Sequence, residues 1–143
     1  MKLQIGKERM YNPNFGGRND VVGWDVQKIT DGQNIKVTFI SVNSPWRQGI
    51  RLATDKGIEV AGQVYPGVLL WHDNSPKEVI CKCFTKDGNL SIYNIWNEGR
   101  YWESQSDFSG MLLEEKGNVI TYHCNDVGLE TNFDKLVFSI EKL

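Results

Sequence analysis

The segment 94–105 carries the side chains of this chain that are best suited to hold a ligand. It combines Trp and Tyr rings with Asn, Glu, Arg and Gln side chains, and a similar mixture occurs earlier in the chain. Flat aromatic rings stack on the apolar faces of sugar rings, while amide, carboxylate and guanidinium groups hydrogen-bond to sugar hydroxyls. We therefore predict a ligand site formed by Trp96, Asn97, Arg100, Tyr101, Trp102, Trp46 and Arg47.

Two other interpretations explain the same aromatic residues. Trp, Tyr and Arg also dominate the contacts of protein–protein interfaces, so a protein partner is an alternative to a glycan. Large aromatic side chains also fill the space between packed β-sheets. Of the five Trp residues, Trp24, Trp71 and Trp96 lie in strand-like runs, and we expect at least two Trp in the core. Trp46 and Trp102 are then the better surface candidates.

The stretch 124–134 concentrates oxygen-bearing side chains around one glycine. Calcium binds about six to eight oxygen ligands, which come from carboxylates, Asn side chains and backbone carbonyls. The spacing does not match an EF-hand loop. The predicted metal ligands are Asn125, Asp126, Asn132 and Asp134. The alternative is a polar turn in which Asn and Asp side chains bond to the backbone at strand ends.

The three cysteines are predicted to pack in the core. Cys81 and Cys83 share one face of a strand, which lacks the turn that structural zinc sites use and suits a disulfide poorly. Cys124 follows His123 directly, so the two side chains point to opposite faces of a strand. Zinc binding that includes His72, and a reactive thiol, stay as alternatives. Unpaired thiols favour a cytoplasmic protein, with secretion as the alternative if a leader was removed.

No sequence motif assigns a reaction. The chain has no Gly-x-Ser-x-Gly, His-Glu-x-x-His, Walker or dinucleotide-binding motif, so no catalytic residue is predicted. A β-sheet scaffold can nevertheless place two carboxylates at the separation that glycoside hydrolysis needs. A hydrolase with Glu98 or Glu103 as its acid is therefore an alternative to a binding protein.

Charge and size exclude several kinds of protein. Sixteen Lys and Arg against eighteen Asp and Glu leave a net charge of −2, and no run of basic residues exceeds two. Such a chain lacks the basic surface that binds nucleic acid or anionic membranes. No apolar stretch approaches the ~20 residues that span a bilayer. With 143 residues, of which 40% are hydrophobic, the chain is expected to form one globular domain, 1–143.

Short strands joined by turns must position these side chains. Alternating apolar residues and turn signals recur along the chain, and only short segments near 97–107 and 126–133 are candidates for helical turns. The predicted hairpins join 21–29 to 35–42, 78–86 to 89–96 across Asp87-Gly88, and 109–115 to 118–124 across Lys116-Gly117. Further strands are predicted near 49–53, 57–60, 67–72 and 135–140.

These elements predict an all-β fold, either an antiparallel two-layer β-sandwich (jelly-roll-like) or a flattened barrel of about eight strands, with the N- and C-terminal strands paired. On this fold we expect a non-catalytic binding domain that recognises a carbohydrate or glycoconjugate through the aromatic–polar loop. A cytosolic protein-interaction or inhibitor protein of the immunity type, and a β-sandwich glycoside hydrolase, are the alternatives. No cofactor is predicted apart from calcium.

Overall fold

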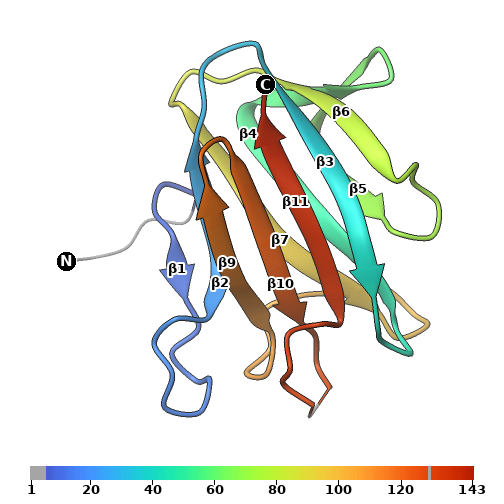
Figure 1. Ribbon diagram of the computed structural model, residues 1–143. Coiled ribbons are helices and arrows are strands. Elements are labelled where there is room, and N and C mark those ends of the chain that lie inside the picture. Colours follow the sequence, from blue (N-terminus) through green and yellow to red (C-terminus); the bar gives the residue numbers. More distant parts are fainter. Residues whose placement is uncertain (1–5, 129) are drawn as a thin grey trace.

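A computed structural model describes residues 6–128 and 130–143 of the chain. All regular structure in these residues is β-strand (Figure 1). Of the two candidates for helical turns, 97–107 contains β8, and the described part of 126–133 contains neither helix nor strand. No helix in this part of the chain is long and apolar enough to cross a membrane. The strands are β1 (Met10–Tyr11), β2 (Val22–Lys28), β3 (Gln33–Val42), β4 (Arg47–Val60), β5 (Gln63–Trp71), β6 (Glu78–Cys83), β7 (Asn89–Asn97), β8 (Trp102–Glu103), β9 (Gly110–Lys116), β10 (Val119–Asn125) and β11 (Leu136–Lys142).

A closed circuit of antiparallel strands forms a barrel. Each strand pairs with the next in the order β2-β9-β10-β11-β3-β6-β4-β7, and β7 pairs back with β2. The remaining strands β1, β5 and β8 attach to β2, β4 and β7. Two junctions are narrow, since β2 meets β9 only at Val22 and Met111, and β4 meets β6 only at Ile58 and Glu59. The prediction of an antiparallel all-β fold is confirmed, and the barrel is the form that it takes.

A bend in β4 closes the barrel. The first half of β4, up to Ala53, pairs with β7, whereas the second half, from Ile58, meets β6. The Thr54 hydroxyl holds the bend, because it accepts from the backbone N–H of Gly57 and donates to the Gly57 carbonyl, both at 2.9 Å. The two short strands predicted for this region are therefore two halves of one long strand.

Two of the three predicted hairpins are wrong, although their strands exist. β2 pairs with β1, β7 and β9 rather than with β3, and β6 pairs with β3 and β4 rather than with β7. The Asp87-Gly88 turn does not fold the chain back, because its backbone bonds elsewhere. The Asp55 carboxylate accepts the N–H groups of Lys86 and Asp87, both at 3.1 Å. The Gly88 carbonyl accepts from the N–H of Ile29 at 3.0 Å, so the chain crosses from β6 to β7 near the end of β2.

The third predicted hairpin, β9 with β10, is confirmed. Lys116 pairs with Val119 across a two-residue turn, and Gly117 in that turn has a φ of 60°, which glycine adopts readily. The expected pairing of the N- and C-terminal strands is wrong, because β11 lies between β10 and β3.

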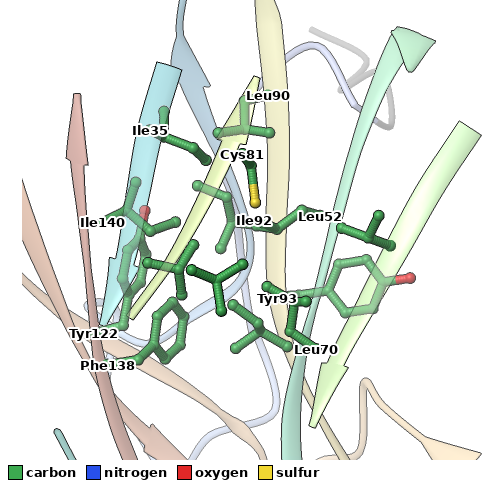
Figure 2. Packing of buried hydrophobic residues seen from close by; sticks show 14 of the residues in the cluster. Ile35, Leu52, Leu70, Cys81, Leu90, Ile92, Tyr93, Tyr122, Phe138 and Ile140 are labelled. Carbon is green, nitrogen blue, oxygen red and sulfur yellow. The ribbon is translucent and has the colours of Figure 1, made fainter. Parts of the chain in front are cut away.

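Apolar side chains from all sides of the circuit fill the barrel interior. Figure 2 shows Ile35, Leu90 and Ile92 converging with side chains from neighbouring strands, and the ring of Tyr122 lies against that of Phe138, with centroids 4.7 Å apart. Full burial of one such apolar side chain contributes roughly 1.5–3 kcal/mol. Two Trp residues, at positions 71 and 96, are also buried, which confirms the expectation that at least two Trp belong to the core.

The carboxylate of Asp25 is fully buried on β2, in register with the core residue Ile92 of β7. It accepts hydrogen bonds from Arg9 Nε at 2.7 Å, Gln27 Nε2 at 2.9 Å and the Tyr122 hydroxyl at 2.7 Å. Burial and the charge of Asp25 raise the pKa of Tyr122, so the phenol keeps the proton that it donates. The network joins the N-terminal segment, β2 and β10.

Replacing Asp25 is expected to destabilise the fold strongly. Asp25→Ala leaves the buried donors of Gln27 and Tyr122 and the partly buried guanidinium of Arg9 without their acceptor, and it should lower the free energy of unfolding by about 3–5 kcal/mol. Tyr122→Phe removes one charge-assisted bond and should cost about 1.5–3 kcal/mol. Urea denaturation measures both values.

Glu115→Gln is the matched control, because Glu115 is an exposed partner of the same Arg9 guanidinium, at 2.8 Å. Its loss should cost no more than ~1 kcal/mol. Equal costs for Asp25→Ala and Glu115→Gln would show that the buried network does not hold the barrel.

Candidate functional site

Three loops that hold the predicted site residues meet at one end of the barrel. They are 43–46 between β3 and β4, 98–101 between β7 and β8, and 126–135 between β10 and β11 (Figure 1, lower end). Hydrogen bonds to Asp126 from Ser44 Oγ, at 2.6 Å, and from Gln48 Nε2, at 2.9 Å, join two of these loops. Segments that lie far apart in the sequence are thereby brought together.

The loop 98–101 and β8 enclose a hollow of about 190 Å³ lined by Glu98, Arg100, Tyr101 and Glu103. Asn97 shapes this loop, because its Oδ1 accepts the backbone N–H of Gly99 at 2.7 Å. Gly99 has a φ of 120°, which non-glycine residues rarely adopt. The ring of Tyr101 is 66% exposed, so a ligand in the hollow can reach it.

Trp102 projects to the other side of β8 from Glu103. β8 pairs with β7 so that Glu103 lies opposite Trp96 and Trp102 lies opposite Asn97, and consecutive strand residues point to opposite faces. Glu103 therefore shares a face with the buried Trp96, whereas Trp102 is 38% exposed and shares its face with Asn97. The predicted residues of this segment are divided between two faces of the sheet.

The carboxyl groups of Glu98 and Glu103 contact each other in the hollow. The hydrogen bond with Glu103 raises the pKa of Glu98 above its ordinary value, and the negative charges of Glu103 and Asp126 act in the same direction. The pair therefore holds a proton more tightly than an isolated Glu would.

The Glu98→Gln variant is expected to flatten the dependence of stability on pH. Because the pKa of Glu98 is raised in the folded state, its contribution is present below about 4.5, the ordinary value, and is lost as the pH rises through the folded-state pKa. Gln donates the same hydrogen bond at every pH. Melting temperatures between about pH 4 and about pH 7 measure this dependence.

Glu59→Gln, which removes a carboxylate from the β4–β6 junction, is the control for the change in net charge. An identical pH profile for Glu98→Gln, Glu59→Gln and the unaltered chain would contradict the proton-sharing contact.

Trp96 lies in the barrel interior, with only 1% of its surface exposed. Its indole Nε1 and the Oε1 of the facing Gln48 are buried, and neither has a hydrogen-bond partner among the described residues. The same holds for Oδ1 of Asn125. These polar atoms lie near the barrel end, where a bound water or hydroxyl group would satisfy a donor and an acceptor together.

Trp46 and Arg47 are neighbours in the sequence, but their side chains lie in different surroundings. Trp46 lines a cavity of about 370 Å³ together with Ser44, Asp126 and Lys135. The Arg47 guanidinium instead lies 4.4 Å from the centroid of the Trp71 ring, and its Nε donates to Asp73 at 2.8 Å.

Trp71 can lie flat against β4 because residue 49 is glycine. A Cβ at Gly49 would stand 2.7 Å from Cε3 of Trp71. Any larger residue at position 49 would therefore clash with the Trp71 ring unless the ring moved. Arg47 therefore makes its cation–π contact with a Trp ring of the hydrophobic core cluster, and neither residue lines the Trp46 cavity.

The four predicted metal ligands each have a separate role in the loops. Asp126 Oδ1 accepts the N–H of Gly128 at 2.8 Å, and its Oδ2 accepts from Ser44 Oγ of the first loop and from Gln48 Nε2 on β4. Asn125 Nδ2 donates to a backbone carbonyl at 2.9 Å, Asp134 accepts from an Asn side chain at 2.7 Å, and Asn132 is exposed. Across residues 6–128 and 130–143, no group of three or more His, Cys, Asp or Glu side chains is arranged to hold a metal ion. The contacts are those of polar turns at strand ends.

The cysteines are free and buried, as predicted for core residues. Burial raises the pKa of Cys81 to about 11 and that of Cys83 to about 12, and it also raises the pKa of Cys124. His123 bonds instead to Glu114, at 2.7 Å. A thiolate nucleophile is therefore disfavoured at all three positions.

The three thiols are expected to resist a disulfide reagent such as dithionitrobenzoate in native buffer. Reaction requires the thiolate and access to it, so labelling should proceed only through opening of the barrel. All three should react within minutes in denaturant. One equivalent of rapid labelling in native buffer would contradict this.

A groove that the sequence did not reveal lies between β1 and the loop that follows β8. It has a volume of about 330 Å³ and is lined by Met10, Tyr11, Asn12, Pro13, Asn14, Gly23, Trp24, Gln105, Ser106 and Asp107. Trp24 was expected in the core, and no role was assigned to the stretch 10–14. The signal available was the run of Tyr, Asn, Pro and Asn in 11–14, which resembles the polar–aromatic mixture of 94–105.

No family model and no curated protein matches the chain. Among solved structures, the chain is similar to the lectin CV2L of Chromobacterium violaceum, determined in complex with alpha-methyl-fucoside. The two share 14% sequence identity, the match covers 80% of this chain and 92% of that chain, and the TM-score is 0.45.

Proposed function

We propose that this chain is a non-catalytic carbohydrate-binding domain. Its site is the hollow formed by Glu98, Arg100, Tyr101 and Glu103. One observation carries the proposal: an exposed aromatic residue, Tyr101, stands in this hollow next to carboxylate and guanidinium groups. The exposure of aromatic rings to water is unfavourable, so a ligand that covers these rings gains hydrophobic free energy.

The chemistry of the hollow matches a sugar better than a purely apolar ligand. A pyranose ring has an apolar face, which suits stacking on Tyr101, and hydroxyl groups, which suit two carboxyl groups and one guanidinium. Glu98 and Glu103 accept hydrogen bonds from hydroxyls, while Arg100 donates them. Two acidic groups against one basic group disfavour a negatively charged sugar.

The close contact of the carboxyl groups supports binding rather than hydrolysis. Retaining glycosidases separate their two carboxyl groups by about 5 Å and inverting ones by more, which leaves room for the sugar or a water. The Glu103 side chain approaches Glu98 closely enough to raise the pKa of Glu98, which argues against the wider separation that a scissile bond needs. The hydrolase alternative therefore has less support.

A second candidate function is binding of a protein partner, and the edge of β5 favours it. β5 pairs only with β4 among the described strands, and Val64, Tyr65 and Leu69 on it are exposed. An edge strand with exposed apolar residues is a common docking surface for another chain. Pro66, in the middle of β5, limits the length of edge that can pair.

Binding of neutral sugars is expected to depend on Tyr101. Tyr101→Ala should weaken the affinity for a responding sugar at least about tenfold, which is about 1.4 kcal/mol. Tyr101 is exposed, so the melting temperature without ligand should hardly change. A thermal-shift screen of neutral methyl pyranosides identifies the ligand, and calorimetry gives the affinities.

Phe108→Ala is the matched control, because Phe108 is a comparably exposed aromatic residue of the following loop that does not line the hollow. It should bind like the unaltered chain. Unchanged affinity in folded Tyr101→Ala would remove this site. A screen without any response, at ligand concentrations up to tens of millimolar, would favour the protein-partner function.

A further inference from the structure

The groove between β1 and the loop 104–109 has the parts of a ligand site of its own. Its apolar wall consists of the Tyr11 ring, 49% exposed, and the indole of Trp24. The indole packs on the Tyr93 ring, with centroids 4.6 Å apart, so the barrel wall fixes its position. We propose that this groove is a second binding site, for an uncharged monosaccharide unit.

Polar atoms face the apolar wall across the groove. Gln105 donates its Nε2 to the Gly23 carbonyl at 2.6 Å, which leaves its Oε1 as an acceptor beside Gly23. Asn14 donates its Nδ2 to one carboxylate oxygen of Asp107 at 3.1 Å, so the other oxygen of Asp107 and Oδ1 of Asn14 can accept. Acceptors on one side and aromatic rings on the other complement the hydroxyls and the apolar face of a sugar ring.

The charge of the groove lining decides the charge of the ligand, because the neighbouring Arg9 guanidinium is already paired with Asp25 and Glu115. Among the described lining residues, Asp107 is the only charged one. Its carboxylate repels an anionic sugar, since no lining side chain offsets the negative charge. The occupant is therefore a neutral sugar unit rather than a uronic or sialic acid.

The groove is held open by the side chain of Asn12. Its Nδ2 lies within hydrogen-bond distance of three carbonyl oxygens, those of Ser106 at 3.1 Å, Asp107 at 3.2 Å and Ser109 at 2.8 Å. Gln105 has a φ of 61°, in the left-handed region that non-glycine residues seldom occupy. Strain of this kind persists where the surroundings impose it, and here it directs the Gln105 amide across Gly23. A preformed groove loses little entropy on binding.

This inference rests on the proposed function for its class of ligand, but it concerns different residues. A chain with two separate sugar sites can engage two branches of one glycan, and the second contact then forms at a high effective concentration. Weak single sites would in this way give firm attachment to a glycan-rich surface.

Amide chemical shifts in ¹⁵N-labelled protein, titrated with neutral methyl pyranosides and with glucuronate, test the second site. The amides of Gly23, Gln105 and Asp107 report on the groove, and those of 98–103 report on the hollow. We expect one neutral pyranoside to shift both groups, with separate saturation curves, and glucuronate to leave the groove amides in place.

Gln105→Gly is the informative variant, because glycine keeps the left-handed backbone while removing the amide. It should weaken binding at the groove at least tenfold and leave the hollow unchanged. Asp107→Asn removes the charge at constant shape and should admit glucuronate to the groove. Phe108→Ala, outside both sites, should bind as the unaltered chain does.

The outcomes separate the two proposals. If a pyranoside shifts only the amides of 98–103, the groove inference is overturned and the proposed function stands. If it shifts only the groove amides, the hollow is not the site, while the groove inference stands. Groove shifts that persist unchanged in Gln105→Gly, or that glucuronate produces equally in the unaltered chain, also overturn the inference.

Discussion

A carboxylate removed from water must find its hydrogen-bond donors within the protein, and the donors to Asp25 come from three separate parts of the chain. Gln27 is on the same strand, Tyr122 comes from β10, which only β9 separates from β2, and Arg9 comes from the segment before β1. Because Arg9 directly precedes Met10 and Tyr11, its bond to Asp25 also places the strand that forms one wall of the groove. One buried charge thus links the closure of the barrel to the position of a surface site.

Local sequence patterns predicted the strands well and their partners poorly. The alternation of apolar and polar residues identified β11, whose Leu136, Phe138 and Ile140 are buried. The glycine at position 117, a typical turn residue, identified the β9–β10 hairpin. Pairing across the barrel depends on contacts that no local pattern encodes. The Asp87-Gly88 turn has the composition of a hairpin, yet Asp55, more than thirty residues earlier, binds its backbone. The pairing of β4 with β5 was not predicted for a different reason: its turn places Ala61 at a φ of 52°, and alanine gives no signal for this left-handed conformation.

The candidate site was predicted in part. The exposure of Tyr101 and Trp102 agrees with a ligand site in 94–105, but composition does not tell which face a strand residue occupies. Trp96 and Trp102 have the same chemistry and differ only in the side of the sheet to which β7 and β8 direct them. The groove could not be predicted from the sequence, because its walls come from 10–14 and 105–107, and side-chain bonds of Asn12 and Asn14 bring them together.

The strands of the barrel are held together by two kinds of interaction, and the two narrow junctions differ from the other strand pairs in this respect. Within the ladders, main-chain hydrogen bonds repeat along each strand, whereas β2 and β9, or β4 and β6, share only one or two residue pairs. Across those junctions the two halves adhere mainly through interdigitated side chains of the common interior. Hydrophobic adhesion weakens on cooling, whereas hydrogen-bonded ladders depend far less on it. The barrel therefore consists of two hydrogen-bonded parts that are held together mainly by apolar side-chain packing. Cooling, rather than heating, is the condition that weakens the contact between these two parts selectively.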